Sequence, residues 1–234
     1  MDHEQDQNDK IISLFETKQS ENIELAFQLC VGLEANYNQT VAKHLRNHIF
    51  LCLRYGLETA YTQTLYDLII SDRNLTYLPA EIEQLISLTS FSLGYNRLQK
   101  LPKEIGYLPV LKELWITNTL IKELPAEIGQ LSQLQELTLY ENQLYAIPAE
   151  IGRLAQLKVL SLHHNQLTHL PPEIGQLTRL ERLFLNDNQL TILPESIRQL
   201  TQLKILRLQR NPISKEEIAR IRTWLPQCQV EFGE

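Results

Sequence analysis

The chain has 234 residues, enough for one or two ordinary domains, and its hydrophobic fraction of 43% is normal for a folded protein. Its net charge is −6 and no long segment is basic, so the usual electrostatic drive for binding nucleic acids or anionic membranes is missing. Three cysteines, with no Cys-x-x-Cys pair, argue against a disulfide scaffold and against a zinc knuckle.

The start of the chain is acidic and polar, whereas a secretory signal needs a basic start followed by an apolar stretch. No apolar run approaches the length of a membrane span. We therefore expect a cytoplasmic protein without membrane attachment, although secretion routes that use no such signal leave no mark in a sequence.

The first 64 residues lack any repeat and are expected to be helical. Residues 1–9 are predicted to be disordered, and a helix should begin at Ser20. A second helix is predicted from about Gln39 to Tyr55, where Gly56 stops it. Residues 10–64 are interpreted as a helical cap on the solenoid that follows. A small separate adaptor domain is the alternative, but about 60 residues make a marginal independent core.

From Leu65 the sequence follows a 23-residue period, L-x-x-L-x-L-x-x-N-x-L-x-x-L-P-x-x-I-x-x-L-x-x. Six full copies begin at Leu65, Leu88, Leu111, Leu134, Leu157 and Leu180, and a partial seventh runs from Leu203 to Ile213. Such a period is typical of a solenoid, in which no coil can bury its apolar residues alone and stacked neighbours share one core. Residues 65–213 are therefore predicted to form the repeat domain.

Each copy should contain a short strand, because its L-x-L segment alternates apolar and polar residues. The asparagine after the strand can both donate to and accept from backbone groups inside the bend. Stacked parallel copies should align these side chains as an asparagine ladder of Asn96, Asn142, Asn165, Asn188 and Asn211. The ladder position holds Arg73 in the first copy and Thr119 in the third, so we expect the third coil to be locally weaker.

The return segment Leu-Pro-x-x-Ile-x-x-Leu is predicted to be a short 3-10 or single-turn helix on the convex side. Four copies carry a glycine after the isoleucine, which we expect to ease a tight turn without a functional role: Gly106, Gly129, Gly152 and Gly175. A glutamate near the start of the return segment is interpreted as a solvated helix-start carboxylate rather than an acidic docking strip.

Residues 214–234 are predicted to cap the other end of the solenoid. Ser214 and Glu217 have the spacing of a capping box that opens a helix. Ile221 and Trp224 fall on one face of this helix and should seal the last coil as core residues. The segment after Pro226 is expected to add a final extended piece.

The 23-residue pattern resembles the leucine-rich-repeat family, in its LP-x-E-I-G-x-L subclass, which is found in bacterial-type intracellular repeat proteins. The resemblance covers about residues 65–234. It implies an α/β solenoid with a curved parallel β-sheet, short convex 3-10 or helical turns, a helical N-terminal cap and a C-terminal capping helix.

Five variable positions of each copy flank the strand leucines: the second, third, fifth, seventh and eighth. Their side chains should point to the concave face, where they can vary without disturbing the core. Large rings and arginines at these positions are predicted to contact a partner: Tyr95, Trp115, Tyr140, His163, Arg182, Phe184 and Arg207. Exposed aromatic residues on a rigid surface fit interface anchors, although such rings can also simply pack on cross-strand neighbours.

These features favour a protein–protein interaction module that binds a protein or peptide on the concave β-face. The charge along this face changes from acidic to basic, which would orient a partner of opposite polarity. The alternative is a structural or regulatory scaffold that acts through self-association or an absent effector domain. We expect a monomer, with no nucleic acid and no membrane among its partners.

No enzymatic activity or cofactor is expected, because the sequence has no phosphate-binding glycine loop and no H-E-x-x-H motif. His164 lies in one column with Glu141 and Asp187, which is more typical of a surface histidine between acids than of a metal site. Ser161, His163 and Asp187 could approach one another, but nothing supplies the oxyanion hole that a catalytic triad needs.

Overall fold

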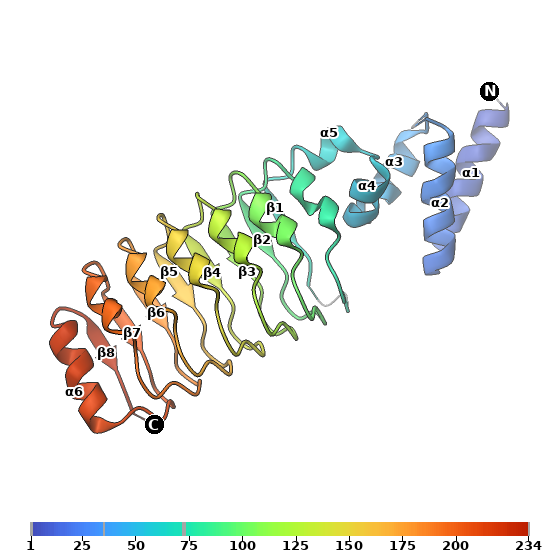
Figure 1. Ribbon diagram of the computed structural model, residues 1–234. Coiled ribbons are helices and arrows are strands. Elements are labelled where there is room, and N and C mark those ends of the chain that lie inside the picture. The colour runs from blue at the N-terminus through green and yellow to red at the C-terminus, as the bar shows by residue number, and fades with distance from the viewer. Residues whose placement is uncertain (1, 35, 72–73, 234) are drawn as a thin grey trace. The chain divides into compact units, whose positions relative to one another are not determined.

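The computed structural model describes residues 2–34, 36–71 and 74–233, with side chains from residue 5 onward. The chain divides into two compact units, Met1–Leu65 and Tyr66–Glu234, which are coloured from blue to red along the sequence in Figure 1. Arg73, which the repeat places at the first ladder position, lies outside the described residues.

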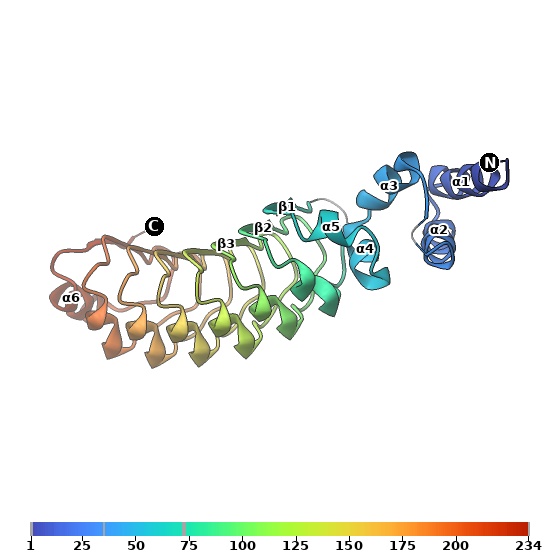
Figure 2. The same cartoon turned by 90° about the horizontal axis from the view of Figure 1, so that it is seen from above.

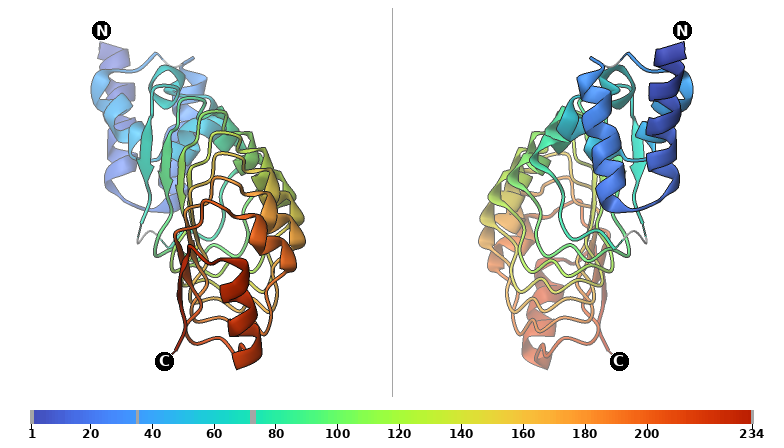
Figure 3. Two further views of the ribbon diagram at one scale, coloured as in Figure 1. Left: turned by 90° about the vertical axis from the view of Figure 1, so that its left-hand side faces the viewer. Right: turned by 90° about the vertical axis from the view of Figure 1, so that its right-hand side faces the viewer.

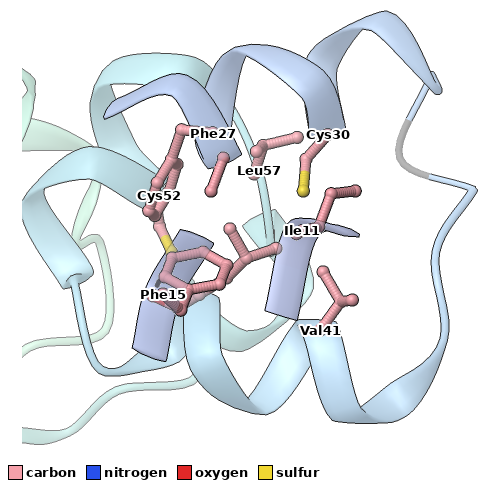
Figure 4. Packing of buried hydrophobic residues seen from close by; sticks show 9 residues of the cluster. Ile11, Phe15, Phe27, Cys30, Val41, Cys52 and Leu57 are labelled. Atoms are coloured by element: carbon pink, nitrogen blue, oxygen red, sulfur yellow. Dashed lines mark hydrogen bonds between the residues drawn. The ribbon is translucent and has the colours of Figure 1, made fainter. Parts of the chain in front are cut away.

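The N-terminal unit consists of helices around a small apolar core. The helices are α1 (Asp2–Glu16), α2 (Ser20–Gly32), α3 (Gln39–Arg46), α4 (Ile49–Tyr55) and α5 (Thr59–Thr62). Their buried side chains converge between α1, α2, α3 and α4, as Figure 4 shows for Ile11, Phe15, Phe27, Cys30, Val41, Cys52 and Leu57. The unit thus has a core of its own; its role as a cap stays a prediction.

The disorder expected over residues 1–9 is not what the structure has, because α1 begins at Asp2. The first half of this helix is polar, and its second half packs into the core through Ile11 and Phe15, which are almost fully buried. Asn8 is buried as well, and its Oδ1 accepts a hydrogen bond from the backbone N–H of Asn38 at 3.0 Å. The sequence pattern missed this helix because its apolar residues lie only in its second half.

The single helix expected from Gln39 to Tyr55 is two helices, α3 and α4. The chain breaks at Asn47 and His48, where His48 has non-helical backbone angles. This break lets the His48 ring stack on Phe15 and meet the edge of Phe27. The end of α4 is as expected, since Gly56 adopts the left-handed conformation with φ of 65°.

The second unit is a parallel sheet joined to a row of 3-10 turns. The strands are β1 (Asp67–Ile69), β2 (Ser90–Ser92), β3 (Glu113–Trp115), β4 (Glu136–Thr138), β5 (Val159–Ser161), β6 (Arg182–Phe184), β7 (Ile205–Arg207) and β8 (Gln229–Glu231). The turns are η1 (Ala80–Gln84), η2 (Lys103–Tyr107), η3 (Ala126–Gln130), η4 (Ala149–Arg153), η5 (Pro172–Gln176) and η6 (Glu195–Gln199). Figure 2 shows the strands along one side of the coils and the turns along the opposite side.

The strands pair in sequence order from β1 to β8, and all pairs are parallel. Each residue pairs with the one 23 positions later, as Leu114 does with Leu137, so the repeat length sets the register. The last step is 24 residues, because β8 lies beyond the repeats and pairs Leu206 with Val230. The leucines of the repeat fill the interior between the strands and the turns, which confirms the predicted solenoid core.

The asparagine ladder is confirmed in the bends that follow β2, β4, β5, β6 and β7. The amide nitrogen of Asn165 donates to the carbonyls of Leu162 (3.0 Å) and His163 (3.2 Å) in its own coil. It also donates to the Leu139 carbonyl of the preceding coil (2.9 Å), while its Oδ1 accepts from the Leu144 N–H (3.0 Å). The same pattern of contacts recurs at Asn96, Asn188 and Asn211.

Thr119 interrupts this ladder in the third coil. Its hydroxyl donates to Oδ1 of Asn142 at 2.5 Å, and its backbone N–H donates to the same oxygen at 3.0 Å. A threonine has one donor where asparagine has two, so it cannot serve the backbone carbonyls on both coils. The weaker third coil remains a prediction with this local cause.

The glycines of the return segments are needed for space rather than for backbone freedom. A Cβ on Gly129 would stand 2.3 Å from the Glu150 carbonyl oxygen of the next coil, and one on Gly106 would stand 2.1 Å from that of Glu127. The turns of neighbouring coils therefore approach so closely that a methyl group does not fit between them. The expected tight turn is present, but the constraint comes from the neighbouring coil.

Helix α6 (Lys215–Trp224) closes the far end of the solenoid. The Ser214 side chain caps it by accepting from the Glu217 N–H at 3.2 Å. The Glu217 side chain is buried and accepts from the backbone N–H of Leu193, so it joins the helix to the sixth coil. Ile221 is fully buried as expected, whereas Trp224 is only half-buried beneath the Arg220 guanidinium and is not a core residue.

Candidate partner-binding surface

The strand face is defined here as the third, fifth, seventh and eighth residues of each repeat. In each interior strand the middle residue is fully buried, as Leu137 is in β4, and its two neighbours point out of the opposite side of the sheet. Figure 3 views the coils end-on, with the strands on one side and the 3-10 turns on the other. The strand-face residues therefore point away from the leucine core; that they can vary in sequence without disturbing it stays a prediction.

The structure brings most of the predicted contact residues together around one cavity of about 430 Å³ on the strand face. Five of them line it: Tyr140, His163, Arg182, Phe184 and Arg207. Trp115 borders the cavity, because its indole N–H donates at 2.9 Å to Oε1 of Glu136, which belongs to the lining. Tyr95 is 56% exposed but is not part of this cavity.

The cavity exists because two small residues lie between two large rings. The fifth residues of successive coils are Trp115, Thr138, Ser161 and Phe184, which are paired in register across β3 to β6. Thr138 and Ser161 are buried at the base of the face, while the two rings are only half-buried. Neighbouring strands are about 4.8 Å apart, so the rings stand about 14 Å from each other.

One wall of the cavity is a stack of Tyr140 and His163, whose ring centroids are 4.7 Å apart and nearly parallel. Nδ1 of His163 lies 2.8 Å from the Ser161 hydroxyl, which fixes the orientation of the imidazole. Burial lowers the pKa of His163 below its ordinary value, and the charge of His164 lowers it further. His163 is therefore neutral near pH 7 and offers an uncharged ring to a ligand.

The carboxylate of Asp187, beside the cavity, accepts hydrogen bonds from neighbouring side chains. Both of its oxygens accept from the Arg210 guanidinium, and Oδ2 also accepts from the Asn186 amide at 2.7 Å. Its Oδ2 lies 3.4 Å from Nε2 of His164. The Arg210 hydrogen bonds in particular lower the pKa of Asp187 to about 2.

Replacing Arg210 with alanine is expected to raise the pKa of Asp187 toward its ordinary value. In the wild type, this depressed pKa stabilises the fold at and above about pH 4, and the contribution is lost as the pH falls through about 2. A carboxyl-carbon NMR titration of Asp187 in both proteins measures the change. Arg153→Ala, on an exposed turn, is the control, and an unchanged Asp187 titration in Arg210→Ala would refute the assignment.

The residues considered for catalysis or metal binding are not assembled in the way that either chemistry needs. Ser161 does contact His163, but the Asp187 carboxylate contacts His164 instead. Within the described residues, no group of three or more His, Cys, Asp or Glu side chains is placed to hold a metal ion. The arrangement orients rings and charges, and no carboxylate of a described residue accepts a hydrogen bond from the His163 imidazole.

Family comparison agrees with this geometry. A family model described as a leucine-rich repeat region matches residues 69–162, and another described as a leucine rich repeat matches residues 155–213. Together these matches cover more than half of the chain. The chain belongs to the leucine-rich-repeat family. No curated protein is detectably similar to this leucine-rich-repeat protein.

Solved structures of other leucine-rich-repeat proteins are similar to this one. A leucine-rich-repeat protein of Leptospira interrogans is 35% identical, with a TM-score of 0.51 over 75% of this chain and 57% of that one. The ectodomain of the Arabidopsis thaliana receptor kinase GASSHO1/SCHENGEN3, in complex with CASPARIAN STRIP INTEGRITY FACTOR 2, is 31% identical, with a TM-score of 0.60. The match covers 69% of this chain and 21% of the receptor ectodomain.

The plant peptide hormone receptor RGFR1, in complex with RGF2, is 27% identical, with a TM-score of 0.62 over 75% of this leucine-rich-repeat protein and 29% of the receptor. This chain thus spans less than two thirds of each of these three structures. Among its described residues, no helix is both long enough and apolar enough to cross a bilayer.

Sequence reasoning missed several residues that shape the strand face of this leucine-rich-repeat protein. Glu231 of β8 accepts from Arg207 and from Gln209, both at 2.9 Å, yet it lies outside the repeat and carries no periodic signal. The eighth residues adopt left-handed backbone angles without being glycine, namely Tyr95, Asn118, Glu141, His164, Asp187 and Arg210. This regular positive φ sets the direction of those side chains and could have been suspected only from the sharp bend before the asparagine.

Proposed function

We propose that this protein is an interaction module that binds a protein or peptide through the strand face. The observation that carries the proposal is the cavity in which half-buried Tyr140, His163 and Phe184 surround a floor of small residues. Rings held in place by their neighbours lose little entropy on binding and are typical anchors of interfaces. The similar plant receptors, a receptor kinase ectodomain in complex with CASPARIAN STRIP INTEGRITY FACTOR 2 and a peptide hormone receptor in complex with RGF2, support the same class of function.

The test is capture of partners by the immobilised protein, compared with a Trp115→Ala/Phe184→Ala double variant. Loss of two anchor rings is expected to weaken partner binding at least about 30-fold, since a hot-spot residue contributes about 2 kcal/mol or more. The melting temperature should change by only a few degrees, because both side chains are half-buried. Tyr145→Ala, with a ring that is 46% exposed outside the strand face, serves as the control. Unchanged capture by the double variant would reject the proposal.

A second candidate, self-association, is favoured by an apolar edge on the first coils. Tyr66, Ile86 and Val110 are exposed there and line a shallow cavity of about 480 Å³. Apart from Ala155, the coils from the third onward carry polar residues at the corresponding edge positions. We expect a monomer by size exclusion with light scattering; a dimer that disappears in Ile86→Lys would support self-association instead.

We also infer a cytoplasmic protein without enzymatic activity. Burial raises the pKa of the free thiols of Cys30 and Cys52 to about 12 and that of Cys228 to about 11, so these cysteines are poor nucleophiles. Free, unreactive thiols suit a reducing compartment. The engagement of Asp187 by Arg210 likewise supports a role for the strand face in binding rather than in catalysis.

A further inference from the structure

The charge on the strand face changes sign across the cavity. Glu113 and Glu136 are the third residues of their coils on β3 and β4, whereas Arg182 holds the same position on β6. Arg207 follows on β7 as a fifth residue. The cavity lining holds two arginines, Arg182 and Arg207, and one carboxylate, that of Glu136, in a chain of net charge −6.

The carboxylates around the cavity are already occupied. Oε1 of Glu136 accepts from the Trp115 indole N–H at 2.9 Å and from the Thr138 hydroxyl at 3.3 Å. Asp187 is engaged by Arg210 and Asn186. Arg182 is exposed, and its side chain forms no ion pair or hydrogen bond within the described part of the chain. An unpaired guanidinium therefore stands at the edge of an aromatic cavity.

Arg207 is held in place on the neighbouring strand. Its Nε donates to Oε2 of Glu231 at 2.9 Å, and its guanidinium carbon lies 5.1 Å from the centroid of the Phe184 ring. Its terminal nitrogens have no hydrogen bond to any described residue. Arg207 is thus oriented by Glu231 and Phe184 while keeping donors for a ligand.

The two arginines are close enough to share one acceptor. Arg182 is paired in register with Ile205, two residues before Arg207, so the two arginines are diagonal neighbours on adjacent parallel strands. With strands about 4.8 Å apart and a rise of about 3.3 Å per residue, diagonal neighbours on parallel strands are about 8 Å apart at the backbone, a gap that two long side chains can close. Guanidinium groups are well suited to such a task because their planar donors match the two oxygens of a carboxylate.

We propose that Arg182 and Arg207 form a carboxylate-recognition subsite for an acidic side chain of an extended peptide bound in the strand-face cavity. The peptide also carries a basic residue that faces Glu113, three strands away. Three strand spacings are about 14 Å, which an extended chain covers in about four residues. The subsite rests on the proposed function and adds to it a ligand class, an acid and a base about four residues apart.

The test is selection from a random dodecapeptide library displayed on phage, using the full chain as bait. Wild-type protein should enrich peptides with Asp or Glu about four residues from Lys or Arg. The charge-reversal variant Arg182→Glu should select a basic residue in place of the acid. A synthetic wild-type peptide should bind Arg182→Glu at least about tenfold more weakly, since a hydrogen bond to a charged group contributes about 1.5–3 kcal/mol. Arg153→Glu, on the exposed turn η4, should behave like wild type.

The outcomes separate this subsite from the function on which it rests. Peptides that lack the acid and base but lose affinity for Phe184→Ala would overturn the carboxylate subsite and leave strand-face binding in place. Peptides that bind Phe184→Ala and Trp115→Ala as well as wild type would overturn both. A switch of the selected acid to a base in Arg182→Glu alone supports the subsite.

Discussion

Replacing Asn165 with alanine is expected to destabilise the solenoid by about 3–5 kcal/mol. The substitution removes three hydrogen bonds to backbone carbonyls and one from a backbone N–H; three of the four are buried, and the one to the His163 carbonyl is partly buried. Each buried polar group left without a partner costs about 1–3 kcal/mol, and some of the carbonyls keep other donors. Denaturant unfolding followed by circular dichroism measures the loss.

The adjacent residue provides a matched control for this substitution. Gln166 is exposed, and its backbone hydrogen bond to Leu144 does not involve its side chain, so Gln166→Ala should change stability by less than about 0.5 kcal/mol. The converse variant, Thr119→Asn, should complete the ladder and gain about 1 kcal/mol. Equal stability of Asn165→Ala and Gln166→Ala would show that the ladder does not hold the coils together.

Replacing Gly129 with alanine is expected to destabilise the solenoid by about 2–4 kcal/mol. The added methyl group would stand 2.3 Å from the Glu150 carbonyl oxygen, and because that oxygen belongs to the backbone, the whole next coil has to move. Overpacking of this kind costs about 1–3 kcal/mol or more. At about 2–4 °C per kcal/mol, the melting temperature should fall by roughly 4–16 °C.

Gly94, in the same unit, provides a control for the Gly129→Ala substitution. A Cβ there would meet the Thr117 side-chain oxygen at 2.9 Å, and a side chain can rotate away where a backbone carbonyl cannot. Gly94→Ala should therefore cost much less than Gly129→Ala. Similar losses from both alanines would show that the contact with the carbonyl oxygen of the next coil is not the cause, because the lower backbone entropy of alanine in the unfolded chain stabilises a protein.

The fold of the repeats could be predicted closely from the sequence because every coil follows one pattern. The leucines of all the coils therefore indicate the same strand register. The same logic failed where the pattern ends. Helix α1 has too few apolar residues to be recognised as a helix that packs on a core. The Glu217 side chain points inward and accepts a hydrogen bond from the Leu193 N–H, a contact between residues 24 positions apart that no local pattern indicates. The break at His48 depends on rings from two other helices, which no local pattern encodes.

The candidate site was predicted to the level of the face but not of its contacts. Alternation within the strands places Phe184 and Arg207 outside the core, and this follows from periodicity alone. That Glu136 would engage Trp115 depends on side-chain rotamers, and that Glu231 would hold Arg207 depends on a strand added after the repeats. Such contacts depend on three-dimensional packing, which a single sequence leaves open.

Every coil of the solenoid touches only the coils immediately before and after it, as the stepwise pairing of β1 to β8 shows. Cooperativity in such an array is passed from neighbour to neighbour. Thr119 lies at one of these links, where it replaces an asparagine of the ladder and forms fewer hydrogen bonds to the backbone. Under mechanical or thermal load we therefore expect the array to part at this link, so that the coils after it, which carry the cavity, stay folded while those before it open.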